Sequence, residues 1–169
     1  MFDADSAEER AGYARSQNMG SCSTKPVLLA PLPPQASHYG GTAVDPSSDD
    51  ALEGMLQDHS TWLNGFGGAP ANLSGMNLAG VDLSGRDLSH ARFSGSNLSG
   101  ANLQGTILER ADFTKAKLQG ADLSCANLVY AEFDGADLSG ANLSHANLEH
   151  VDLIGVNLDG AINSAVPRF

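Results

Sequence analysis

The sequence predicts an all-β solenoid that follows a short α-helix and a disordered N-terminal arm. Two observations indicate the solenoid. From Ala71 to Gly160 the chain divides into eighteen five-residue words without an insertion, and the central residue is Leu in fifteen words and Phe in three. A period of five fits neither the 3.6-residue period of a helix nor the alternation of a strand. It suits a solenoid, in which each short unit buries its apolar face on the next.

The N-terminal arm is expected to span residues 1–48. This segment contains Ser, Gly, Gln and a Pro cluster, and it has no periodic apolar face. Such a composition buries too little apolar surface to offset the entropy lost on ordering. Its acidic start, MFDADSAEER, lacks the apolar core of a secretory signal. No stretch of the chain has the apolar length of a membrane helix. We therefore predict a cytoplasmic protein without membrane insertion.

Residues 49–66 are expected to form one amphipathic helix. Asp49 or Asp50 can cap its start, and Gly65 can end it. The apolar residues recur at helical spacing, with His59 on the same stripe. A single helix of this length is not stable alone. We therefore expect it to pack on the first repeats as a structural cap, mainly through Leu56, Trp62 and Leu63.

The words follow the pattern A(D/N)LXX. Ala opens eleven of them, Asn or Asp takes the second position in fourteen, and Gly ends eleven. In this pattern the chain resembles the pentapeptide repeat family. The resemblance implies a right-handed quadrilateral β-helix over residues 71–165, followed by a tail over 166–169. Four words make one square coil, so eighteen words give about 4.5 coils. The LxxHxxWL pattern that ends at Leu63 also resembles the N-terminal cap of some family members.

Three phenylalanines support a four-sided coil independently of the resemblance. Phe93, Phe113 and Phe133 are spaced by twenty residues. A coil of twenty residues places them on one side, with rungs about 4.8 Å apart, so their rings should stack as a structural core. Asn and Asp should point outward and bond nearby backbone groups. The final Gly should supply a positive φ at each corner.

One corner of the expected square has no glycine. Its four final residues are His90, Arg110, Tyr130 and His150. The adjoining wall carries two apolar residues at outward positions, where most words have a polar residue. Aromatic and Arg residues around an apolar centre are typical of binding hot spots. We therefore predict a protein-binding surface that consists of Ile107, Arg110, Val129, Tyr130 and His150. A second interpretation stays open, in which this corner uses a turn that does not need Gly and its side chains have drifted.

The charge and motif content limits the function. The formal net charge is −11, which argues against direct binding to nucleic acid or an anionic membrane. The sequence contains no nucleophile elbow, phosphate loop or metal motif. We therefore expect no enzyme, no metal and no cofactor. The preferred hypothesis is a protein-interaction or scaffold module that presents a rigid square rod to a protein partner.

The resemblance implies an alternative function. Some family members imitate duplex DNA and bind type II topoisomerases such as DNA gyrase. The repeats carry 11 acidic and 5 basic residues between Ala71 and Gly160, which agrees with such mimicry. The chain lacks the loop insertions that such members often carry. Val151 and Val156 replace the small inward residue near the C-terminal end, so this end of the rod needs a cover. Two covers stay open: Val166 and Phe169 of the tail, or a second protomer in a homodimer through the C-terminal coil.

Overall fold

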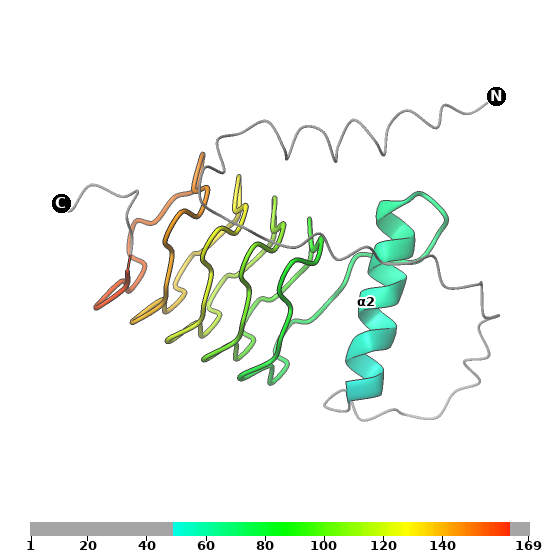
Figure 1. The fold of residues 1–169 in the computed structure, drawn as a ribbon, viewed down its shortest axis with the longest axis horizontal. Coiled ribbons are helices and arrows are strands. Elements are labelled where there is room, and N and C mark those ends of the chain that lie inside the picture. The colour runs from blue at the N-terminus through cyan, green and yellow to red at the C-terminus, as the bar shows by residue number, and fades with distance from the viewer. Residues whose placement is uncertain (1–48, 163–169) are drawn as a thin grey trace.

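A computed structural model describes residues 49–162 of the chain. The arm expected over residues 1–48 and the tail expected over 166–169 lie outside the described residues, and so do residues 163–165 at the expected end of the rod. The described part consists of one helix and a stack of square coils (Figure 1). Within it, no helix is long and apolar enough to cross a membrane.

Helix α2 (Asp49–Leu63) is the one helix of the described part. It ends three residues before the predicted boundary at residue 66, because a C-terminal turn closes it. The N–H of Phe66 donates to the carbonyl of Thr61 at 3.1 Å, and that of Gly65 donates to Trp62 at 3.0 Å. Gly65 has a φ of 75°. This pattern is a Schellman motif, in which glycine is the preferred left-handed residue.

The repeats form parallel rungs with a period of twenty residues. Residues 71–162 contain no extended strand; the second residue of most words makes an isolated parallel bridge to the residue twenty positions later, as Asn97 does to Lys117. The next residue strengthens the rung, because the N–H of Leu98 donates to the carbonyl of Lys117 at 2.7 Å. This pairing confirms the predicted solenoid and its four words per coil.

The core is a set of apolar columns inside the square. The central Leu and Phe side chains from Leu73 to Leu143 are at most 4% exposed, and the Ala residues two positions earlier are also buried. The rings of Phe93 and Phe113 stack with centroids 4.8 Å apart, and those of Phe113 and Phe133 with centroids 5.0 Å apart. Leu73 continues this column as a buried residue, whereas Leu153 at the other end is half-buried.

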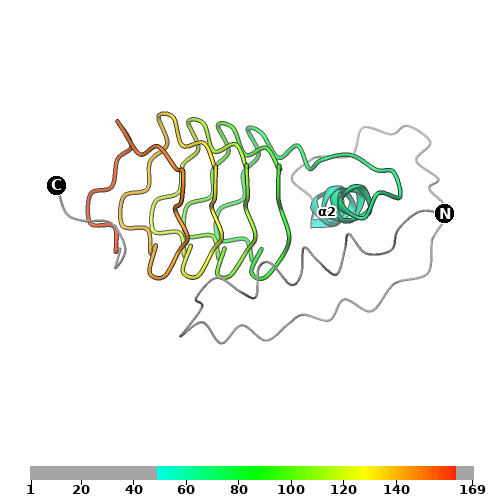
Figure 2. The ribbon, with the colours of Figure 1, turned by 90° about the horizontal axis from the view of Figure 1, so that it is seen from above.

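Helix α2 lies across one end of the stack, as the two perpendicular views show (Figures 1 and 2). Leu52 and Leu56 are buried and belong to one apolar cluster with the core of the coils. Trp62 and Leu63 are only half-buried. The buried side chains of the helix are therefore Leu52, Leu56 and His59, rather than the predicted Trp62 and Leu63.

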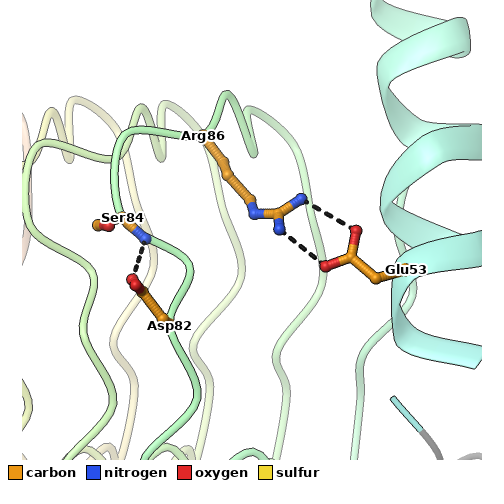
Figure 3. Close-up of polar contacts among 4 residues, drawn as sticks. All are labelled: Glu53, Asp82, Ser84 and Arg86. Atoms are coloured by element: carbon orange, nitrogen blue, oxygen red, sulfur yellow. Dashed lines mark hydrogen bonds and ion pairs between the residues drawn. The ribbon is translucent and has the colours of Figure 1, made fainter. Parts of the chain in front are cut away.

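The outward Asp and Asn residues stabilise the corners. The carboxylate of Asp82 accepts a hydrogen bond from the N–H of Ser84 at 3.0 Å (Figure 3). Hydrogen bonds from the side chain and the backbone of Ser84 hold the pKa of Asp82 below its usual value. Asn102 and Asp122 make the same contact two residues ahead. Each contact is an Asx turn, which favours the tight corner that follows.

Candidate protein-interaction corner

All corners of the rod share one backbone conformation. Gly95 closes its word with a φ of 66°, and Gly105 with 63°. The seven words that do not end in Gly have final residues with φ between 56° and 63°. These residues are His90, Arg110, Lys115, Cys125, Tyr130, His145 and His150. The glycine-free corner therefore has the same left-handed φ as the other corners, so the part of the second interpretation that gave it a different turn is wrong.

The uniform conformation follows from the hydrogen bonds of the word. At Arg110 the chain must turn so that the N–H of Ala111 can donate to the carbonyl of Leu108, at 3.1 Å. The N–H of Ala101 makes the equivalent bond to Leu98 beside Gly100, at 3.0 Å. A side chain at such a position costs roughly 1–2 kcal/mol relative to favoured backbone regions. Each side chain at the glycine-free corner therefore raises the backbone energy of the folded protein above that of a glycine at the same position.

Three of these side chains form one stack, which we call the corner stack: Arg110, Tyr130 and His150. The Tyr130 and His150 rings are 4.5 Å apart between centroids, with planes 5° apart. The guanidinium carbon of Arg110 lies 5.5 Å from the centroid of the Tyr130 ring. Tyr130 remains 46% exposed. The phenol ring of Tyr130 thus lies between the Arg110 guanidinium and the His150 imidazole, and part of it still faces solvent.

The two apolar residues of the predicted surface lie in different columns of the same wall. Val129 is half-buried beside the corner stack, and its carbonyl accepts the N–H of Arg110 at 2.9 Å. Ile107 is also half-buried, but its rung partner is Asn127. The structure therefore groups Val129 with the corner stack and places Ile107 one column away. His150 also lies beside Glu149, with Nε2 and Oε1 3.5 Å apart.

The glycine-free corner continues toward helix α2 through contacts that the sequence did not predict. His90, at the start of the same corner, meets the Trp62 ring edge to face at 5.9 Å between centroids. On helix α2 the Trp62 ring stacks on His59 at 5.8 Å. The sequence signal that could have predicted this contact is the twenty-residue spacing from His90 to Arg110. It placed His90 at the end of this corner nearest to the helix.

An ion pair also joins helix α2 to the first coil. Arg86 replaces the small inward residue of its word and reaches back to Glu53 on the helix (Figure 3). Its two terminal nitrogens contact the two carboxylate oxygens at 2.8 and 3.4 Å. The bidentate geometry explains a basic residue at a position that otherwise faces the core.

Among residues 49–162, no three His, Cys, Asp or Glu side chains come together as metal ligands. His59 is fully buried and its Nδ1 accepts the N–H of Ala71 at 3.1 Å. This imidazole therefore packs between helix and coil rather than lining a site open to substrate.

The stacked square coils and their five-residue words define a β-solenoid protein. The family model described as "Pentapeptide repeats" matches in eight copies, over residues 71–105, 96–129 and 131–162. These segments include more than half of the chain. The chain belongs to the pentapeptide repeat family, whose fold is the quadrilateral β-helix.

Several solved structures share this repeat. A pentapeptide repeat protein from the thylakoid lumen of Arabidopsis thaliana is 39% identical, with a TM-score of 0.51 over 52% of this chain and 61% of that chain. The present chain thus aligns with less than two thirds of the plant protein. A pentapeptide repeat protein from Nostoc PCC 7120 is 37% identical over 60% of this chain and 93% of its own, with a TM-score of 0.37.

A more distant similarity is to QnrB1, a plasmid-mediated fluoroquinolone resistance protein, at 20% identity over 57% of this chain and 79% of that chain. Its TM-score is 0.28. No curated protein matches the chain.

Proposed function

We propose that the protein is a non-catalytic interaction module whose rod binds a protein partner through the corner stack and Val129. One observation carries this proposal. Tyr130 adopts a left-handed conformation that glycine would adopt without strain, and its ring is stacked and still 46% exposed. Strained conformations persist where the surrounding structure holds them, and they cluster at functional sites.

The geometry of Tyr130 suits an anchor for a partner. Its ring buries much area in an interface while few rotamers are lost. Contacts with Arg110 and His150 hold the ring in place before binding, so little entropy remains to be lost. Val129 adds a half-buried apolar neighbour. Aromatic and Arg side chains are the residues that most often dominate binding energy.

Replacing the anchor tests this function. The double change Val129→Ser and Tyr130→Gly restores the common word of the repeats at this position. Glycine suits the φ of 59° at residue 130, so the rod should stay folded. Quantitative affinity capture with tagged full-length protein should show partner recovery reduced about tenfold, which corresponds to about 1.4 kcal/mol.

A matched control is available at another corner. Lys115 has a φ of 57°, so Lys115→Gly removes a side chain from the same kind of turn on a different edge of the rod. This variant should capture the partner as well as the wild type does. If the double variant is folded and captures the partner normally, the corner stack is not the binding surface.

We further propose that the rod completes about 4.5 coils and that helix α2 caps its N-terminal end. Eighteen words at four per coil support this coil number. The buried side chains of Leu52 and Leu56 and the pair formed by Arg86 and Glu53 support the cap. A solenoid needs such a cap because its terminal coil otherwise exposes apolar core and unpaired backbone.

We also propose a homodimer through the C-terminal coil. Ile154 is 87% exposed and Ile162 is 60% exposed, and the neighbouring inward residues Val156 and Leu158 are only half-buried. Exposed apolar groups gathered at one end of a rod indicate an interface. A two-fold dimer would cover the same surface on both copies. A cytoplasmic location stays a prediction.

The second candidate function is DNA mimicry directed at a type II topoisomerase. The observation that favours it is the excess of 11 acidic over 5 basic residues in the repeats. The unbroken series of words argues against this function, because the chain has no loop insertion between Ala71 and Gly160. We therefore rank it second, and a supercoiling assay described below distinguishes it from the corner-stack function.

A further inference from the structure

We propose that His59 makes the docking of helix α2 onto the first coil sensitive to acid, so that protonation of its imidazole releases the helix from the rod. The proposal concerns the end of the rod beside Trp62. It is independent of the partner surface proposed above. It rests on the position of one buried imidazole between two elements of the fold.

The geometry of His59 fixes its protonation state in the docked helix. The side chain is fully buried, and its Nδ1 lies 3.1 Å from the backbone nitrogen of Ala71, which donates the hydrogen bond. Nδ1 must therefore be unprotonated, so the proton of the neutral ring is on Nε2. Within residues 49–162, the buried Nε2 atom has no hydrogen-bond partner. The site accommodates a neutral imidazole and offers little to an imidazolium.

Protonation would disrupt this contact in two ways. A proton on Nδ1 would face the N–H of Ala71, so two donors would oppose each other across 3.1 Å. The added charge would also be buried without a hydrogen-bonded anion, which is costly. Burial accordingly lowers the pKa of His59 below its ordinary value of 6.5.

The charged and titratable groups around His59 come from the first coil. The carboxylate of Asp87 favours the protonated ring, and His90 opposes it. On the helix itself, the Trp62 ring stacks on the imidazole. Burial outweighs the attraction of Asp87, since the net pKa shift is downward. The ion pair of Arg86 and Glu53 joins the same elements elsewhere.

The direction of the effect follows from proton linkage. In the undocked helix His59 is in water and binds a proton below about pH 6.5. The docked helix excludes that proton until a lower pH. Docking is therefore at full strength above pH 6.5. As the pH falls below that value, the equilibrium constant for docking decreases. The decrease is up to about tenfold per pH unit, because one proton binds when the helix is released. Release would expose Leu52 and Leu56, which are now buried.

Hydrogen exchange of the full-length protein between pH 7.5 and pH 5.0, corrected for intrinsic exchange rates, tests the proposal. We expect the protection of amides 52–63 to fall by up to about tenfold per pH unit below pH 6.5. The protection of a central rung amide such as that of Leu103 should not change over the same range. Equal protection of the helix at both ends of the range would overturn the proposal.

Two variants separate His59 from its neighbour. His59→Asn keeps an acceptor near the Nδ1 position but cannot be protonated, so the pH dependence should vanish whatever the baseline protection. His90→Asn removes the other imidazole beside Trp62 and should retain the pH dependence. A folded His59→Asn variant with an unchanged pH response would refute the inference.

A measurement on the wild type keeps the inference testable if His59→Asn does not fold. Nitrogen-15 NMR of the imidazole rings should show His59 as the Nε2–H tautomer at pH 7.5. Its protonation should coincide with the loss of protection in the helix. If the ring becomes protonated while the helix stays protected, or the helix opens while the ring stays neutral, the proposal is wrong.

Discussion

The Tyr130 ring lies parallel to the His150 imidazole, with centroids 4.5 Å apart and planes 5° apart. The two residues are one coil apart, and both have positive φ. A left-handed conformation points each side chain outward at the corner, and the rung spacing of about 4.8 Å then brings the rings into contact. The stacking energy of such a pair, roughly 0.5–1.5 kcal/mol, offsets part of the backbone cost.

This balance predicts opposite outcomes for two glycine substitutions. Lys115 has no ring to stack on, because its corner neighbours one coil away are Gly95 and Gly135. Lys115→Gly should therefore raise the free energy of unfolding by about 1 kcal/mol, by relief of the left-handed strain. Tyr130→Gly relieves the same strain but loses its stacking partners, so the free energy should change by less than about 0.5 kcal/mol. Urea denaturation measures the free energy of unfolding of both variants. If the two substitutions stabilise the protein equally, the corner stack contributes nothing to its stability.

The repeat period made much of the rod predictable from the sequence. Because every word is five residues long, the spacing of Phe93, Phe113 and Phe133 was enough to place their rings in one column. The positive φ at Gly95 was predictable for the same reason. A property that repeats along a solenoid can be inferred from any one of its units.

The contacts of the corner were less predictable. A glycine-free corner was compatible with a different turn, and only the φ values of Arg110 and Tyr130 decide the question. Contacts between helix and coil, such as Trp62 with His90, depend on how the helix crosses the end of the rod. No periodic pattern encodes that crossing.

Shortening Phe113 tests the register of the core. Its ring lies between those of Phe93 and Phe133 and is fully buried. Phe113→Ala should leave a cavity and lower the free energy of unfolding by about 3–5 kcal/mol. Phe113→Leu should cost less than about 1.5 kcal/mol, because most words already place Leu there. Denaturant titration compares the two. Small and equal losses would mean that residue 113 does not face the core.

The ion pair of Arg86 and Glu53 should contribute modestly to the docking of helix α2. The side chains are 33% and 62% exposed, so water screens much of their attraction. A double-mutant cycle with Arg86→Ala and Glu53→Ala should give a coupling energy of about 0.5–1 kcal/mol. The coupling should decrease in 1 M salt, where the Debye length is about 3 Å. A coupling indistinguishable from zero at low salt would remove this pair as a support for the helix.

The proposed homodimer predicts a change of mass in solution. Ile154→Glu with Ile162→Glu places charges on two exposed residues at the C-terminal end. Light scattering coupled to size exclusion should show a dimer for the wild type and a monomer for this variant, because an interface would bury the unpaired charges. The pair Ser99→Glu and Ser139→Glu, on a wall of the rod, serves as a control and should remain dimeric. A wild type that is monomeric at 100 μM would exclude a dimer of useful affinity.

The DNA-mimic candidate predicts inhibition or protection of DNA gyrase by the purified protein. Acidic mimicry depends on long-range attraction to a basic DNA-binding surface, so binding should weaken steeply as salt rises. Supercoiling by gyrase at micromolar protein measures the effect.

Asp122→Asn with Asp137→Asn removes two negative charges from the outward positions of two words, while Asn is already the commonest residue there. This variant should keep the fold and lose activity if mimicry operates. The variant Val129→Ser with Tyr130→Gly keeps every formal charge and should behave like the wild type in the same assay. If supercoiling is unaffected by the wild-type protein, the acidic surface serves another purpose and the corner stack remains the candidate for partner binding.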